Sequence, residues 1–373
     1  MPFKLLHTAD LHIGMTFNNR SYPEDVRKKL VEARFEALDK VVELANKEKC
    51  QLLVIAGDLF HRSNVSTEAV IRTQDILKRF EGVTAVLPGN HDYYEPYSAL
   101  WDRFQDKAFD ELVLLIKQRP YKLHDYGIDT VLYPAPCDSK HSAENRLGWI
   151  AELEEKPEGR WHIGIAHGTV RGISPDFDDQ YFPMEVSELT ASNMDHWCLG
   201  HTHVPYPDRH VTGREEFIYS GTPEPDGFDC RHRGSVWITE LDDDDNNHCS
   251  RLMETGQFRF LEVEKEIRGS SDFEGLRKEF TDEGSKTLAK LKLFGTLPEQ
   301  EYNERRAFYK ELEGILLYLE RDDSELTIEI TPEVIDSKYP ANSFPHKFLK
   351  RLAAKNNPDA LQAAYRLIEE VRK

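Results

Sequence analysis

Residues 52–61 read LLVIAGDLFH, in which an unbroken apolar run leads directly into Gly57, Asp58 and His61. A short apolar run that ends at a turn residue is typical of a buried β-strand. In α/β proteins the loops at the carboxyl ends of the strands carry the functional side chains. The stretch therefore predicts a buried strand that delivers a carboxylate and an imidazole to a site.

The same arrangement recurs on both sides of this stretch. The other polar clusters that follow apolar runs are Asp10-Leu11-His12, Gly89-Asn90-His91-Asp92, His167-Gly168 and Gly200-His201-Thr202-His203. One such cluster is more often an ordinary loop than a ligand set, but five in succession are not expected by chance. Carboxylate, imidazole and amide donors from several strand ends can hold two divalent cations side by side, which suits the hydrolysis of phosphate esters. The pattern predicts a dinuclear metallophosphoesterase.

The remaining pattern predicts an α/β fold for residues 1–241, with two stacked mixed β-sheets flanked by helices. Apolar residues at helical spacing predict helices over residues 23–49 and 66–80. The short strands expected at residues 130–133, 217–220 and 235–240 are flanked by Pro and Gly, and we expect them to be antiparallel additions to the sheets.

A change in composition follows this domain. Asp242 to Asp245, followed by Asn246 and Asn247, predicts a solvated linker, because the alternate-position ligands and the glycine of a calcium loop are missing. Residues 251–331 then alternate strands (258–267, 288–294, 315–320, 326–330) with helices (273–280, 299–312), which predicts a smaller α+β domain without a His or Cys cluster. A Pro-rich bridge over residues 332–345 leads to a C-terminal helical segment, residues 346–373.

Charge and cysteine usage limit the function classes. The formal net charge of −19 over 373 residues argues against a self-sufficient nucleic-acid binder. The C-terminal segment is locally basic, so the charge is uneven. The overall acidity weakens a nucleic-acid function without excluding it and suggests that a partner supplies part of the binding. The five cysteines are scattered and form no C-x-x-C pair, which favours a reducing cytoplasm. No long apolar stretch is present, so we expect a cytoplasmic protein without a membrane segment.

The order D-x-H, G-D, G-N-H-D, H, G-H-x-H resembles that of the calcineurin-like metallophosphoesterases, whose fold is an αββα sandwich. Within this superfamily, Gly57-Asp58-Leu59-Phe60-His61 is similar to the nuclease branch typified by the SbcD subunit of SbcCD and its double-strand-break repair counterparts. The resemblance covers the first domain and extends more loosely through the second, which stands where that branch carries a DNA-capping domain.

The resemblance implies a role for each position that matches the motifs of the family. One metal would be held by Asp10, His12, Asp58 and His203, and the other by Asp58, Asn90, His167 and His201. His91 would be the general acid and His61 would contact a non-bridging phosphate oxygen, whereas Asp92 would orient His91 or cap a turn. We expect His7 to be a core residue or to support the ligands. Residues 221–224 are either a turn near the site or simply a turn.

The resemblance further implies two Mn²⁺ ions, a DNA substrate, a homodimer, and an SbcC-like coiled-coil ATPase bound through the C-terminal segment. The expected function is a manganese-dependent DNA exonuclease, with endonuclease activity as a further possibility, in repair or defence. The alternative is a calcineurin-like phosphatase or phosphodiesterase that acts on a small-molecule or protein phosphoester. A binding scaffold with a dead site is disfavoured, because no ligand position is substituted.

Overall fold

The computed structural model of the chain describes residues 2–174, 176, 178–213, 215, 217–242, 248–355 and 357–372. It divides into two compact units, Met1–Phe260 and Leu261–Lys373. Each unit has its own hydrophobic cores. Most of the expected acidic linker, residues 243–247, lies outside the described residues.

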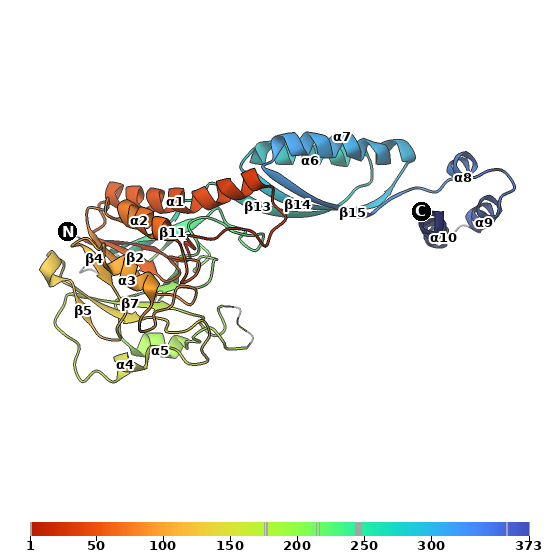
Figure 1. The fold of residues 1–373 in the computed structure, drawn as a ribbon. Coiled ribbons are helices and arrows are strands. Elements are labelled where there is room, and N and C mark those ends of the chain that lie inside the picture. The colour runs from red at the N-terminus through yellow and green to blue at the C-terminus, as the bar shows by residue number, and fades with distance from the viewer. Residues whose placement is uncertain are drawn as a thin grey trace. The chain divides into compact units, whose positions relative to one another are not determined.

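Two β-sheets form the centre of the first unit (Figure 1). The seven-stranded sheet has the order β4 (Leu112–Leu114), β3 (Val83–Leu87), β2 (Leu52–Ala56), β1 (Phe3–Thr8), β11 (Ser235–Leu241), β12 (Cys249–Glu254) and β9 (Val211–Thr212). The five-stranded sheet has the order β10 (Ile218–Tyr219), β8 (His196–Gly200), β7 (Trp161–His167), β6 (Thr130–Ala135) and β5 (Tyr121–Lys122). Strands β1 to β4 are mutually parallel, as are β6, β7, β8 and β10, so each set ends at one edge of its sheet.

Alternation along the strands explains the layers. Leu52 and Val54 of β2 belong to the core between the sheets, whereas Leu53 and Ile55 face the helices. The helices over the larger sheet are α1 (Glu24–Lys47), α2 (Thr67–Leu77) and α3 (Ala99–Gln105). The smaller sheet is covered by α4 (Gly148–Ala151) and α5 (Val186–Ala191), and the 3₁₀ helix η1 (His124–Tyr126) follows β5. The expected α/β fold with mixed sheets flanked by helices is confirmed.

The expectation of antiparallel later strands is only partly right. β11 is antiparallel to β1, as expected, but β10 is parallel to β8 and β6 is parallel to β7. A connection that carries a helix, such as the one with α4 between β6 and β7, allows the chain to cross over and re-enter in the same direction. The composition of a short strand does not record that direction.

The second unit contains a three-stranded sheet, β13 (Arg259–Glu266), β14 (Thr287–Leu297) and β15 (Tyr318–Ile328), with β13 beginning at the end of the first unit. Helices α6 (Ser270–Glu283) and α7 (Glu299–Ile315) cover one face of this sheet (Figure 1). The two strands expected at residues 315–320 and 326–330 are one continuous strand, β15, which pairs with β14 on both sides of a register shift. Part of the expected Pro-rich bridge is helical, since Pro332 starts α8 (Pro332–Lys338). The terminal helices are α9 (Phe344–Ala353) and α10 (Pro358–Arg372).

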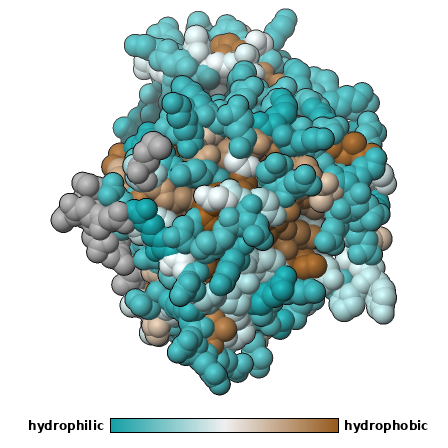
Figure 2. Space-filling model, turned by 90° about the vertical axis from the view of Figure 1, so that its left-hand side faces the viewer, coloured by the Kyte–Doolittle hydropathy of each residue, from teal (hydrophilic) through white to brown (hydrophobic). Residues whose placement is uncertain are grey.

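Hydrophilic residues predominate on the face of the molecule that Figure 2 shows, and the hydrophobic residues there occur in small groups between them. Among the described residues, no helix combines the length and the apolar character that crossing a membrane would require.

Candidate metal centre

The first two polar clusters lie side by side because their strands are parallel neighbours. The backbone N–H of Asp10 donates to Gly57 O at 3.1 Å, and that of His12 donates to Asp58 O at 3.0 Å. These bonds extend the β1–β2 pairing beyond the ends of the strands. They bring the side chains of Asp10 and His12 and that of Asp58, which lies far from them in the sequence, to one edge of the sheet.

The backbone at these positions adopts an unusual conformation. Asp10, His12, Asp58 and His201 all have positive φ, between 48° and 105°. Few residues other than glycine adopt this region, and those that do cluster at functional sites. At Gly89 the constraint is space, because a Cβ there would lie 2.2 Å from Asp58 Oδ1. The loops are therefore shaped to bring the polar side chains together.

One group of donors surrounds His12. Its Nε2 lies 3.1 Å from His203 Nε2 and 3.7 Å from Asp58 Oδ2. Asp10 completes this group, since its ligand atom lies within 4.8 Å of those of His12 and His203. The Oδ2 atom of Asp10 accepts the His201 N–H at 3.0 Å, but buried Oδ1 has no hydrogen-bond partner among the described residues.

A second group of donors lies on the other side of Asp58. His167 Nε2 is 3.4 Å from Asp58 Oδ2 and 3.1 Å from Asn90 Oδ1. His201 Nδ1 is 3.3 Å from the same Asn90 oxygen. Asp58 Oδ2 thus lies within reach of both groups, which is where a carboxylate shared by two cations would have to be.

The donor set fits two divalent cations. Ligands about 2.1 Å from one octahedral ion are roughly 3 Å apart, which is close to the separations within each group. Two imidazole nitrogens that face each other, as those of His12 and His203 do, and an unpartnered buried oxygen of Asp10 are both accounted for by a cation between them. Carboxylate, amide and imidazole donors without a thiolate suit a hard cation such as Mn²⁺.

The protonation of the imidazoles depends on the neighbouring carboxylates. Burial lowers the pKa of His12 well below its ordinary value, and burial with the charge of His167 lowers that of His201 to about 3. Burial has the same effect on His167, but the Asp58 charge outweighs it and raises the His167 pKa to about 9. Since cations bind neutral imidazoles, a cation at the centre would compete with the proton on His167.

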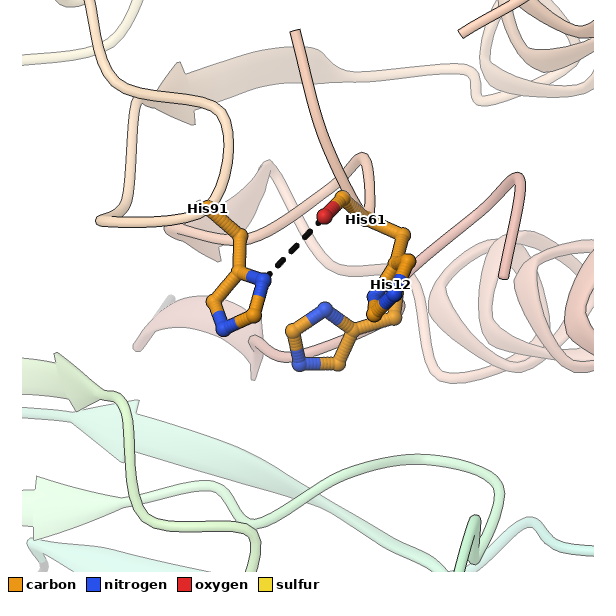
Figure 3. Close-up of side chains that lie close together, drawn as sticks. All are labelled: His12, His61 and His91. Carbon is orange, nitrogen blue, oxygen red and sulfur yellow. Dashed lines mark hydrogen bonds between the residues drawn. The ribbon is translucent and has the colours of Figure 1, made fainter. Parts of the chain in front are cut away.

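His61 and His91 lie beside His12 of the first donor group (Figure 3). The His91 ring centroid is 4.8 Å from that of His12, and the His61 centroid is 5.4 Å from both of the others. His91 Nδ1 lies 3.1 Å from His61 O, and a carbonyl can only accept, so Nδ1 carries the proton of this bond. Burial, with the charges of His91 and Arg62, lowers the pKa of His61 to about 4 and keeps that imidazole neutral at pH 7.

Asp92 does not face the metal donors. Its two carboxylate oxygens accept the backbone N–H groups of Gly89 at 2.7 Å and Phe60 at 2.9 Å. The side chain is fully buried, so both bonds are shielded from water. Asp92 therefore ties the loop after β3 to the loop after β2, which is a positioning contact between the two clusters.

We expect Asp92→Ala to lower the free energy of unfolding by about 2–4 kcal/mol, because it leaves two buried N–H groups without an acceptor. Urea denaturation followed by far-UV circular dichroism measures the change. Asp92→Asn, which keeps one acceptor oxygen, should lose less, and the exposed Asp106→Ala should lose almost nothing. A loss below about 0.5 kcal/mol for Asp92→Ala, the level of an ordinary surface substitution, would contradict this role.

The sequence interpretation missed Asp226, which supports a candidate ligand. Its Oδ1 lies 3.2 Å from His203 Nδ1, and its Oδ2 lies 3.7 Å from the guanidinium of buried Arg34 on α1. A carboxylate on the far nitrogen of a ligating imidazole fixes the tautomer that presents the other nitrogen to the metal. Although burial lowers it, the His203 pKa is raised well above its ordinary value by Asp226.

We expect Asp226→Asn to weaken Mn²⁺ binding by about 10- to 100-fold, because the amide no longer fixes the His203 imidazole. Calorimetric titration of the metal-free protein measures the affinity, and circular dichroism shows whether the fold is kept. Asp229→Asn, three residues further along the chain, is the matched control. Equal Mn²⁺ affinity in the Asp226 and Asp229 variants would show that Asp226 does not support His203.

The sequence analysis also named His7 and the turn of residues 221–224. His7 is buried in β1, in agreement with a core residue. In the turn of residues 221–224, the Thr222 hydroxyl lies 2.9 Å from Asp10 O and the Thr222 N–H donates to His203 O at 3.1 Å. The turn therefore contacts two of the loops that carry candidate ligands.

Residues 3–205 match the model of the family "Calcineurin-like phosphoesterase". The chain belongs to this family. The matched region contains all the candidate ligands from Asp10 to His203, together with His61 and His91. Members of this family are metallophosphoesterases that use divalent cations, which agrees with the donor set at this centre.

Curated relatives at modest identity extend the comparison. The chain is 27% identical over 210 residues (53% of this chain, 48% of the relative) to the uncharacterized metallophosphoesterase YhaO of Bacillus subtilis. It is also 27% identical to the DNA double-strand break repair protein Mre11 of Methanopyrus kandleri, over 241 residues (60% and 49%), and to that of Saccharolobus solfataricus, over 212 residues (54% and 49%). The chain spans about half the length of the curated relatives it matches.

Proposed function

We propose that the protein is a manganese-dependent DNA nuclease that cleaves phosphodiester bonds with two cations, mainly as an exonuclease. The observation that carries this proposal is the position of His61, whose ring centroid lies 5.4 Å from those of His12 and His91. His61 belongs to the motif of residues 57–61, which is similar to that of the nuclease branch. Its placement beside both a candidate ligand and the candidate acid suits a residue that contacts the phosphate.

The cations would be held by Asp10, His12, Asp58 and His203 and by Asp58, Asn90, His167 and His201. When bound, they would activate water for attack at phosphorus and offset the charge that develops there. His61, neutral at pH 7, would donate one N–H to a non-bridging phosphate oxygen.

His91 would donate a proton to the leaving oxygen. Its Nδ1–H donates a hydrogen bond to His61 O. In this neutral tautomer Nε2 carries a lone pair and no proton, so it cannot donate. His91 can act as the acid only when both nitrogens are protonated. The His61 carbonyl accepts the Nδ1–H and so fixes the direction in which Nε2 points.

Two further parts of the proposal concern partners. The relatives named as double-strand break repair proteins support DNA as the substrate. In the second unit, α9 and α10 form an apolar groove with Phe348 at its wall, and Phe344, Leu367 and Val371 are 75%, 63% and 87% exposed. Such a groove can receive an amphipathic helix, and we assign it to the coiled coil of an SbcC-like ATPase. The homodimer and the substrate-guiding role of the second domain stay predictions.

A substrate panel tests the proposal. The Mn²⁺-loaded protein is given linear duplex, hairpin and single-stranded DNA and p-nitrophenyl phosphate esters, each with and without the ATPase. We expect cleavage of at least one DNA substrate, increased by the ATPase. Hydrolysis of the small esters together with inertness toward every polynucleotide would instead identify a phosphatase or phosphodiesterase.

A further inference from the structure

A cavity of about 1110 Å³ opens beside the metal centre, and all its lining residues belong to the first unit. His201 and His203 form one part of its wall. A different part is lined by four arginines: Arg209, Arg231, Arg233 and Arg259. This is a local concentration of guanidinium groups in a chain whose net charge is −19. A phosphoester bound at the cations would therefore have an arginine-lined space next to it.

The segment that carries Arg231 and Arg233 is fixed to the ligand loop. Between them, His232 Nδ1 accepts the Gly234 N–H at 3.1 Å, so its Nε2 carries the proton and donates to His203 O at 2.6 Å. Gly234 has φ +70°, and a Cβ there would lie 2.3 Å from Pro223 O. The backbone that carries the two arginines is thus fixed relative to candidate ligand His203.

The cavity contains both acidic and basic side chains, and they differ in whether they form ion pairs. Asp208, Asp229 and Glu254 also line it, and Arg209 lies 3.5 Å from Glu215. Arg231 is exposed, and within the part of the chain that the structure describes it forms no ion pair or hydrogen bond. A guanidinium of this kind can bind a phosphate through two parallel N–H···O bonds.

Apolar residues line another part of the cavity. Val204, Pro205 and Tyr206 follow the ligand His203 directly and line the same cavity, with Val204 53% exposed. Charged and apolar groups in one cavity can contact the phosphates and the bases of a polynucleotide, whereas a substrate with one phosphate would be held at the cations.

We propose that this cavity is a subsite for the phosphates next to the scissile bond of a polynucleotide, and that Arg231 and Arg233 bind them. The inference rests on the proposed nuclease function and adds to it the residues that distinguish a polynucleotide from a small phosphodiester. It also explains how an acidic protein holds a polyanion, since the cationic contacts are concentrated where the strand leaves the metal centre.

The test compares Arg231→Gln/Arg233→Gln with wild type in the full-length Mn²⁺-loaded protein. The KM for a single-stranded oligonucleotide should rise about 10- to 100-fold, because charge-assisted bonds to phosphate are lost. The salt dependence of oligonucleotide binding should weaken by about one unit of slope for each lost contact. Hydrolysis of bis(p-nitrophenyl) phosphate should be unchanged, which also shows that the variant is folded. Arg79→Gln, an exposed arginine paired with Asp39 after α2, is the matched control.

The outcomes separate the two proposals. If wild type cleaves DNA and the double variant has the KM and salt dependence of Arg79→Gln, the subsite is wrong and the nuclease function stands. If wild type hydrolyses the small diester but no polynucleotide, the nuclease function itself is wrong.

Discussion

Replacing His91 with alanine is expected to slow DNA cleavage by about 10²- to 10⁴-fold, the usual contribution of a general acid, and to leave both cations bound. The reason lies in the geometry: the His91 side chain contacts the His61 carbonyl and the His12 ring, but it is outside both donor groups around Asp58. Cleavage of a defined oligonucleotide and metal analysis of the same sample measure the two effects.

The leaving group sharpens this test. A p-nitrophenolate leaves readily as an anion, whereas a sugar alkoxide needs a proton. Loss of a general acid should therefore slow hydrolysis of bis(p-nitrophenyl) phosphate much less than that of DNA. His124→Ala, a change of an exposed histidine that pairs with Asp129, is the control. Full nuclease activity in the His91→Ala protein, or equal losses on both substrates, would refute the role of His91 as the acid.

Replacing Asp58 with alanine is expected to abolish measurable activity by removing metal, because one oxygen of Asp58 lies within 3.7 Å of His12 Nε2 and 3.4 Å of His167 Nε2. Wild type should hold two Mn²⁺ per chain after dialysis, and the variant fewer than one. Elemental analysis by mass spectrometry gives the stoichiometry.

Asp58 also accepts the His91 N–H at 2.9 Å, so alanine could disturb the His91 loop as well. Asp58→Asn keeps the shape and an acceptor oxygen but removes the charge, and it should still lose metal. Asp106→Ala is the matched control for the loss of one carboxylate. Two bound Mn²⁺ in both Asp58 variants would rule out the bridging role.

The sequence predicted those parts of the site in which a polar cluster directly follows an apolar strand. Parallel strands end at a common edge, so the order of the clusters was enough to place Asp10, Asp58 and Asn90 near one another. Asp226 and Arg34 were missed for different reasons. Asp226 lies in a segment that resembles an ordinary acidic turn, 23 residues beyond its partner His203. Arg34 did leave a signal, because it interrupts the buried stripe of α1 between Leu30 and Leu38.

The fold was predictable to a similar depth. Apolar runs identified the central strands and the helix periodicity identified α1 and α2, since both follow from local burial patterns. The direction of strands β6 and β10 could not be predicted, because it is set by the connections between strands and not by the strands themselves. The single strand β15 was expected as two because Asp322, Asp323 and Ser324 are typical of a turn. In the structure the strand continues through these residues, and its register with β14 shifts there.

The central claim is that the loops after five strands hold two cations that share Asp58. Anomalous diffraction from crystals of the Mn²⁺-loaded protein, recorded at the manganese edge, tests it most directly. We expect two peaks about 3.5–4 Å apart, one between His12 and His203 and the other between Asn90 and His167, with an Asp58 oxygen contacting both. A single peak, or two peaks without Asp58 between them, would contradict it.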